Sequence, residues 1–214
     1  WSDLLVELGI RYDSEEALEL AEEVMRRIQE ESYRSSGELA AWRGTFPAWE
    51  GSIYNQPGIN GIGVRQMRNS APVTIAPTGT ISIIAGASSG IEPLFALSYV
   101  RNVMDKTRLV EVNPWFKQGA EEGGYYSDDL MQQLADVGSA RGLEGVPLEA
   151  QQAFPTSHDI APQWHVRMQA AFQKYTDNAV SKTINLPHDA SVSDVADAYQ
   201  LAYELDCKGI TIYR

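Results

Sequence analysis

The chain has 214 residues, 43% of them hydrophobic, and a formal net charge of −12. This length and composition suit one globular core, and the negative charge argues against nucleic-acid or anionic-membrane partners, which need basic stripes. No apolar run reaches the length of a membrane span. A single cysteine excludes a disulfide framework within the chain and is typical of a reducing compartment, so we expect a cytoplasmic protein.

The first predicted helix begins near Asp13 and ends by residues 35–37. Asp13 is the expected cap, with Glu16 completing a capping-box pattern. Its apolar stripe consists of Leu18, Ala21, Met25 and Ile28. Its other face carries Glu15, Glu19, Glu22 and Glu23, which we interpret as a solvated face rather than a metal site because no histidine lies among them.

Residues 37–63 are rich in glycine, proline and aromatic side chains, and we predict a long irregular connection. Gly58, Gly61 and Gly63 offer a weak match to a dinucleotide-binding loop. Pro57 and the lack of a preceding strand argue against that match.

The stretch from Val73 to Ile84 changes from a strand pattern to a helix pattern across a turn rich in hydroxyl groups. Residues 73–75 are β-branched and suit a buried strand, which Pro77 ends. Gly79 can adopt a positive φ and let a ligand approach the main chain. If a helix begins at Thr80 or Ile81, its first N–H groups face this turn unpaired.

This turn is a candidate phosphate site, because unpaired N–H groups at a helix start attract anions without a lysine. The candidate residues are Thr78, Gly79, Thr80, Ile81 and Ser82. Residues 51–108 are locally basic, with Arg65, Arg68, Arg101, Lys106 and Arg108 against two acids. The alternative is an ordinary connection whose hydroxyl residues merely cap the helix. It is not a Walker loop, since no Gly-Lys-Ser/Thr follows.

Beyond the turn, strands and helices are expected to alternate. We predict a strand within 95–103, a helix capped by Ser127 and reaching Val137, and a linker at 138–155. A further helix is expected to start at Pro162. It is followed by a strand at 180–186, a helix capped by Ser191 and Asp194, and a strand from Ile210. The last three elements form a β-α-β unit, for which parallel strands and a right-handed crossover are expected.

Three further side chains could carry chemistry. His165 lies in an apolar helical stripe and is interpreted as a hydrogen-bonded core residue, because no cysteine or second histidine lies at zinc spacing. Glu92, before Pro93, is interpreted as a helix-entry acid, with a polar wall of an active site as the alternative. Cys207 is interpreted as a packed structural thiol. No metal site is predicted.

Four stretches resemble the adenosylcobalamin-dependent (class II) ribonucleotide reductases. They are Asn69-Ser70 with Ala-Pro-Thr-Gly-Thr-Ile-Ser at 76–82, Ser-Ser-Gly-Ile-Glu-Pro-Leu-Phe-Ala at 88–96, residues 164–187, and residues 207–214. The resemblance implies an α/β fold, a partial barrel of β-α-β units with mostly parallel strands. Residues 1–214 would be a C-terminal fragment of the catalytic barrel domain, without a second domain and with both ends cut from a longer polypeptide.

The resemblance also implies a function. Ribonucleoside di- or triphosphates would be reduced to 2′-deoxyribonucleotides by thiyl-radical chemistry, with adenosylcobalamin as cofactor and a thiol reductant such as thioredoxin as partner. This chain would supply the phosphate turn. The radical cysteine would lie in the missing N-terminal half of the barrel and the cysteine tail that re-reduces the site beyond Arg214, so no catalytic residue is assigned here and the fragment alone should be inactive.

Three alternatives stay open at this point. The chain could belong to the large subunit of a class I reductase, whose radical comes from a partner protein. It could be a non-catalytic module that binds nucleotide phosphates. It could also be an α/β scaffold without a ligand.

Overall fold

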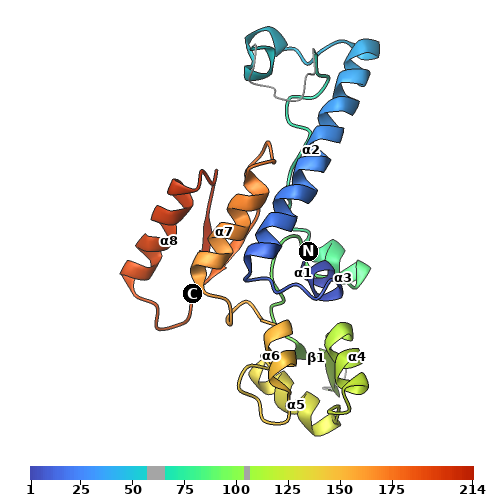
Figure 1. Cartoon of the computed structure of the whole chain (residues 1–214), viewed down its shortest axis with the longest axis vertical. Helices are drawn as coiled ribbons and strands as arrows, with labels where there is room; N and C mark the ends of the chain where they lie inside the picture. Colours follow the sequence, from blue (N-terminus) through green and yellow to red (C-terminus); the bar gives the residue numbers. More distant parts are fainter. Residues whose placement is uncertain (57–65, 104–106) are drawn as a thin grey trace.

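The computed structural model describes residues 1–56, 66–103 and 107–214, so the glycines at 58, 61 and 63, together with Arg65 and Lys106, lie outside the described residues. The described chain is mainly helical, with two small two-stranded sheets (Figure 1). None of its helices combines the length and apolar character that a membrane span needs.

The longest element is α2 (Glu15–Arg43), which follows the short α1 (Ser2–Glu7). Ser14 caps α2 by accepting the N–H of Ala17, whereas Asp13, the expected cap, pairs with Arg11 at 3.0 Å. The helix continues well past its predicted end at 35–37. Ser36 explains the difference, because its hydroxyl accepts the main-chain N–H groups of residues 68 and 69, and this tertiary contact offsets the cost of a helical glycine at 37.

The main core lies between α2 and α7 (Pro162–Gln173), which starts at the predicted proline. Leu18, Ala21 and Met25 are buried there as predicted, but Ile28 is 47% exposed. The glutamates on the opposite face form surface ion pairs, including Glu15 with Arg167 and Glu22 with Lys174. The interpretation as a solvated face is therefore confirmed.

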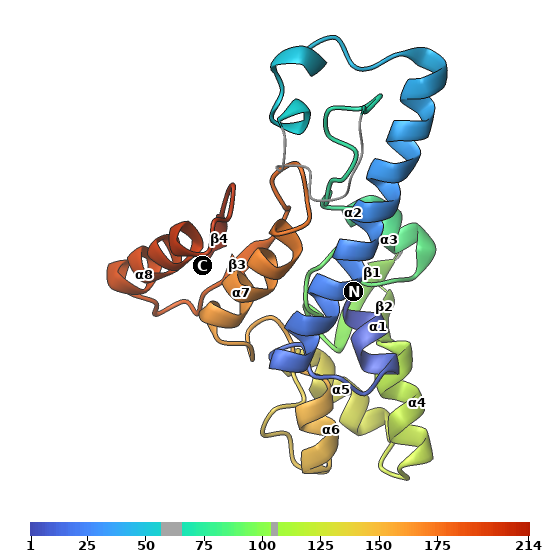
Figure 2. The same ribbon diagram turned by 45° about the horizontal axis from the view of Figure 1, so that its top comes forward.

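A second core gathers α4 (Pro114–Glu122), α5 (Asp128–Val137) and α6 (Leu148–Ala153) against the antiparallel hairpin of β1 (Ser98–Val103) and β2 (Thr107–Val112). Figure 2 shows these helices at the end of the molecule opposite η1 (Trp49–Gly51) and η2 (Ile53–Asn55). The helix from Ser127 is confirmed. The linker expected at 138–155 is wrong in part, because α6 forms inside it.

The second sheet pairs β3 (Thr183–Asn185) with β4 (Thr211–Tyr213) in parallel, and α8 (Val192–Glu204) connects them. The predicted parallel β-α-β unit and the capping box of Ser191 and Asp194 are thus confirmed. The strand expected at 73–75 is reduced to one parallel bridge between Ile75 and Val180. Since β1 and β2 are antiparallel, parallel pairing holds only for part of the fold, and the described strands do not close a barrel.

Candidate functional site

The turn at residues 76–82 leads into α3 (Gly79–Ala85), which begins one or two residues earlier than expected. Thr78 is its N-cap and adopts a left-handed conformation with φ 55° and ψ 21°. The expectation of a positive φ at Gly79 is therefore wrong, because Gly79 is the first helical residue. A left-handed β-branched residue is strained, by about 1–3 kcal/mol, and persists only where the surrounding structure fixes it.

The first turn of α3 presents unpaired main-chain donors. Within the described residues, the N–H groups of Gly79, Thr80 and Ile81 have no acceptor. The N–H of Ser82 differs, because it donates to the carbonyl of Thr78 at 2.9 Å. The hydroxyl of Ser82 donates to the carbonyl of Gly79 at 2.8 Å. The N–H group of Thr78 likewise has no acceptor among the described residues, so of the five candidate residues Ser82 alone has a paired N–H group.

The loop at residues 88–92 lies directly behind this turn. The hydroxyl of Ser89 donates to the carbonyl of Pro77 at 2.7 Å. Gly90 has φ +51°, and a Cβ there would lie 3.3 Å from the carbonyl oxygen of Ala76. A side chain at 90 would therefore push against the turn, so glycine permits the close approach of the two segments.

The outer surface of α3 is apolar and open. Ile81, Ile83 and Ile84 are 63%, 73% and 81% exposed. Arg68, one of the residues behind the expected local positive charge, does not point to the turn. Its guanidinium donates to the carbonyls of residues 44 and 45 at the end of α2. Among the described residues, the donors at this turn are therefore main-chain and hydroxyl groups.

Glu92 takes part in a buried ionic network. Its carboxylate accepts hydrogen bonds from the Lys182 ammonium at 2.6 Å and from the N–H of Thr183 at 2.7 Å. Lys182 also contacts Nδ1 of His165 at 3.0 Å and donates to the carbonyl of Thr183. The interpretation of Glu92 as a helix-entry acid is wrong, since no helix starts after it, whereas His165 is confirmed as a hydrogen-bonded core residue.

The protonation states of this network follow from its contacts. Nδ1 of His165 faces an ammonium and must accept, so Nε2 carries the proton and donates to the carbonyl of Ser157 at 3.0 Å. Burial and the charge of Lys182 lower the pKa of His165 to about 3. Burial also lowers the pKa of Lys182, and the charge of Glu92 opposes that shift. We assign neutral His165 beside the ion pair of Lys182 and Glu92.

Asp177 fixes the segment that enters the turn. Its carboxylate accepts the N–H of Val73 at 2.9 Å and the hydroxyls of Tyr33 and Tyr54. Burial and the hydrogen bond to Asp177 raise the pKa of Tyr33, so this phenol stays protonated. Sequence reasoning missed this cluster, because Asp177 lies more than 100 residues along the chain from each of its partners.

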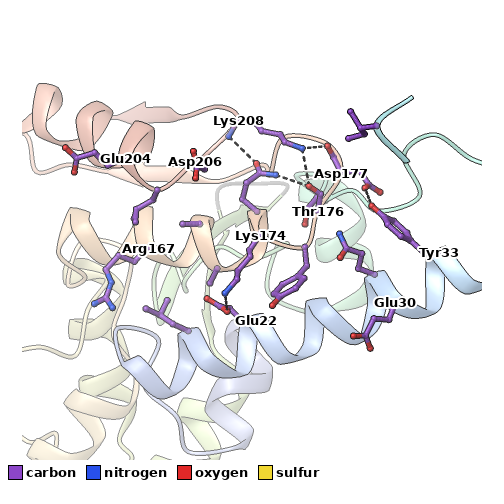
Figure 3. A pocket seen from close by; sticks show the side chains of 18 of the residues that line it. Glu22, Glu30, Tyr33, Arg167, Lys174, Thr176, Asp177, Glu204, Asp206 and Lys208 are labelled. Atoms are coloured by element: carbon purple, nitrogen blue, oxygen red, sulfur yellow. Dashed lines mark hydrogen bonds and ion pairs between the residues drawn. The ribbon is translucent and has the colours of Figure 1, made fainter. Parts of the chain in front are cut away.

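The largest cavity described, about 1040 Å³, lies away from the turn, between α2, α7 and the segment after α8 (Figure 3). Its cations are already bound within the protein. Lys174 pairs with Glu22, Arg167 pairs with Glu15, and Lys208 donates to the carbonyls of residues 176 and 177. This cavity therefore presents no basic side chain prepared for a phosphate.

The remaining reactive groups do not form a centre. Cys207 is half-buried, and burial raises the pKa of its thiol to about 11, so it stays protonated near neutral pH. Throughout residues 1–56, 66–103 and 107–214, acids, histidines and the cysteine form no cluster that could hold a metal ion. The interpretation of Cys207 as a packed thiol agrees with this environment.

Comparison with known proteins gives the class first. The alpha subunit of a class Id ribonucleotide reductase from Actinobacillus ureae has a similar structure, with a TM-score of 0.77 and 27% identity over all of this chain and 37% of that subunit. A family model described as ribonucleotide reductase, barrel domain, matches residues 1–213. The chain belongs to this ribonucleotide reductase barrel-domain family.

Curated relatives carry a more specific name. The chain is 52% identical to a vitamin B12-dependent ribonucleoside-diphosphate reductase of Thermoplasma acidophilum and covers 27% of that protein. It is 47% identical to the protein of the same name from Mycobacterium tuberculosis and covers 30% of it. Each comparison spans the whole of this chain. The resemblance found in the sequence blocks is thus confirmed.

Proposed function

We propose that this chain is part of an adenosylcobalamin-dependent reductase that converts ribonucleotides into 2′-deoxyribonucleotides, and that residues 78–82 hold the substrate's phosphates. One observation supports the site above others. The N–H groups of Gly79, Thr80 and Ile81 are unpaired at a helix start, in a chain whose relatives are named vitamin B12-dependent ribonucleoside-diphosphate reductases. Such donors favour an anion through both hydrogen bonding and the helix dipole.

The left-handed Thr78 supports this role. A left-handed residue next to helical ones turns successive N–H groups toward one point, which is the arrangement of anion-binding nests. Each hydrogen bond to a charged oxygen contributes about 1.5–3 kcal/mol. The hydroxyls of Thr78 and Thr80 would add donors, whereas Ser82 would take part only if its hydroxyl left the carbonyl of Gly79. Fixing the phosphates would place the ribose for reaction.

The chemistry itself needs groups from outside this chain. Replacing the 2′-hydroxyl by hydrogen releases water and oxidises two thiols to a disulfide, and a further cysteine carries the radical. This chain has one cysteine, whose thiol is protonated and half-buried. We therefore assign no catalytic residue here. The rest of the reductase would supply the thiols, and a thiol reductant such as thioredoxin would restore them.

We further propose that the chain is one part of a single α/β barrel domain. The chain spans 27% and 30% of the length of the two reductases just compared. The three exposed isoleucines of α3 and the small parallel sheet of β3 and β4 are surfaces that additional chain could cover and extend. A reducing cytoplasm would suit this thiol chemistry.

We assign no cobalamin-binding residue to the described chain. His165 uses both ring nitrogens in hydrogen bonds, and Arg167 and Lys174, which line the large cavity, are already paired with carboxylates. These groups do not form a fitting surface for a broad corrin ring. The cofactor, which would generate the radical, is proposed for the full-length reductase on the names of the relatives. The same names favour the cobalamin class over a class I large subunit.

The substitution Gly79→Val in the full-length reductase tests the phosphate turn. A Cβ at 79 meets no protein atom within 4 Å, so the variant should fold and block only a ligand's approach to the N–H groups. We expect the dissociation constant for a ribonucleoside diphosphate to rise at least about tenfold, equivalent to about 1.4 kcal/mol. Gly119→Val in α4 is the matched control, since its Cβ also meets nothing within 4 Å.

Two further measurements separate the proposal from its rivals. Unchanged nucleotide affinity in Gly79→Val would remove the turn from the substrate site. Activity of the full-length reductase without added adenosylcobalamin, given a partner subunit, would support class I instead. Nucleotide binding by a full-length protein that shows no reductase activity with cobalamin and a dithiol would support a non-catalytic module.

A further inference from the structure

Lys182 ties together three segments that are distant in sequence. It precedes β3, its side chain is 0% exposed, and its ammonium reaches Glu92 in the loop behind the turn, His165 in the first turn of α7, and the carbonyl of Thr183. An ammonium has three protons, and each has an acceptor here. The cost of burying the charge is therefore offset as completely as geometry allows.

Glu92 connects this buried centre to the turn. Both carboxylate oxygens are engaged, one by Lys182 and the other by the N–H of Thr183. Its own N–H donates to the carbonyl of Ser89 at 2.9 Å, and Ser89 in turn donates to the carbonyl of Pro77. A continuous series of contacts thus runs from α7 through Lys182 and Glu92 to the residue just before Thr78.

This series offers a reason for the strained conformation of Thr78. A left-handed threonine is unfavourable alone, and the neighbouring segments must hold it. The ideal Cβ position of Gly90 lies 3.5 Å from both the carbonyl oxygen of Pro77 and Oγ1 of Thr78, so the loop sits against the residue that adopts this conformation. A loop anchored at Glu92 therefore limits where the turn can move.

We infer that Glu92 is a positioning residue for the phosphate turn, held in place by Lys182 and by the main chain of Thr183. It acts through residues 89 and 90 on the carbonyls of residues 76 and 77, and so fixes the direction of the N–H groups at the start of α3. The inference rests on the proposed function of the turn. The substrate's affinity would then depend on the ion pair of Glu92 with Lys182, which does not touch the substrate.

The test uses Glu92→Gln in the full-length reductase, because glutamine keeps the shape of the side chain and removes the charge that holds Lys182. We expect KM for the ribonucleotide to rise about fivefold or more, with kcat changed less than about twofold. Glu15→Gln is the matched control, since it removes an exposed acid paired with Arg167 at 2.6 Å. Ser89→Ala, which deletes the contact to Pro77, serves as a milder second variant if Glu92→Gln does not fold.

A double-mutant cycle with Gly79→Val distinguishes positioning from general stability. If Glu92 acts through the turn, its effect on KM shrinks in the Gly79→Val background. Equal effects in both backgrounds, or a lower melting temperature with unchanged KM, would overturn the inference. If Gly79→Val weakens binding while neither Glu92→Gln nor Ser89→Ala does, only the inference fails. If Gly79→Val leaves affinity unchanged, the proposed function fails first.

Discussion

Asp177 and Val73 hold one another by two hydrogen bonds that run in opposite directions. The carboxylate of Asp177 accepts the N–H of Val73 at 2.9 Å, and the N–H of Asp177 donates to the carbonyl of Val73 at 3.2 Å. The pair therefore joins the segment that follows α7 to the segment that enters the candidate site. Tyr33 of α2 and Tyr54 of η2 complete the contact from a third direction.

Asp177→Ala should destabilise the protein measurably. The substitution removes the carboxylate that accepts the N–H of Val73 and the hydroxyl of Tyr33, and each poorly solvated donor that loses its acceptor costs about 1–3 kcal/mol. We expect the free energy of unfolding, measured with urea on the full-length protein, to fall by at least about 1 kcal/mol. Asp197→Ala, at an exposed position of α8, is the control. Equal midpoints for the two variants would show that the cluster does not anchor this segment.

His165 should make stability depend on pH in the mildly acidic range. Its folded-state pKa is lowered to about 3, against an unfolded value near 6.5, so below about pH 6.5 the unfolded state binds one more proton. Stability from this group is therefore complete above that pH and is lost as the pH falls toward 3. The loss between pH 7.5 and 5.5 should be about 1.4 kcal/mol.

The matched variant for this effect is His165→Gln, which cannot titrate. Unfolding at pH 7.5, 6.5 and 5.5 should show a smaller loss of stability on acidification in the variant than in the parent. Its stability at pH 7.5 is expected to be lower, because Lys182 loses an acceptor in the buried network. Parallel pH profiles for the two proteins would mean that folding does not lower the pKa of His165.

Phe116 should matter mainly to the second core. Its side chain is 0% exposed and makes edge contacts with Phe154 at 5.3 Å and Tyr125 at 6.4 Å between ring centres. Phe116→Ala should cost about 3–5 kcal/mol through the cavity that it leaves. Hydrogen exchange should accelerate in α4 to α6 more than in α2 and α7, because the two groups of helices have separate cores. Val137→Ala, at a position 64% exposed, should change little.

Local signals predicted several elements well. Ser127, Pro162 and Ser191 each mark a helix start in the structure, because caps and first-turn prolines act through neighbouring residues only. The end of α2 was predicted wrongly, since Ser36 and Gly37 favour a stop by propensity but Ser36 bonds residues 68 and 69. The helix α4 was missed although it carries signals of the same kind, since Asn113 caps it and Pro114 opens it. The helix α6 has no side-chain cap.

At the candidate site, too, the features set by neighbouring residues were predicted and those set by distant contacts were not. The blocks around residues 76–82 and 88–96 sufficed to find the family, and the unpaired N–H groups lie at the start of α3 as expected. The positive φ expected at Gly79 is found at Thr78 instead, where the loop containing Gly90 packs against the turn. The partnership of Lys182 with Glu92 was not predicted, since 90 residues separate them. A lysine and a glutamate within otherwise apolar stretches were the available signal.

The sealed environment of Lys182 has a practical consequence for chemical labelling. Amine-reactive acylating agents need an accessible, uncharged amine, and this one is enclosed with all its protons engaged. Lys117 and Lys174, whose side chains are 49% and 56% exposed, would be modified long before it. The rate of acylation at Lys182, followed by mass spectrometry, would therefore report how often the buried network around this residue opens.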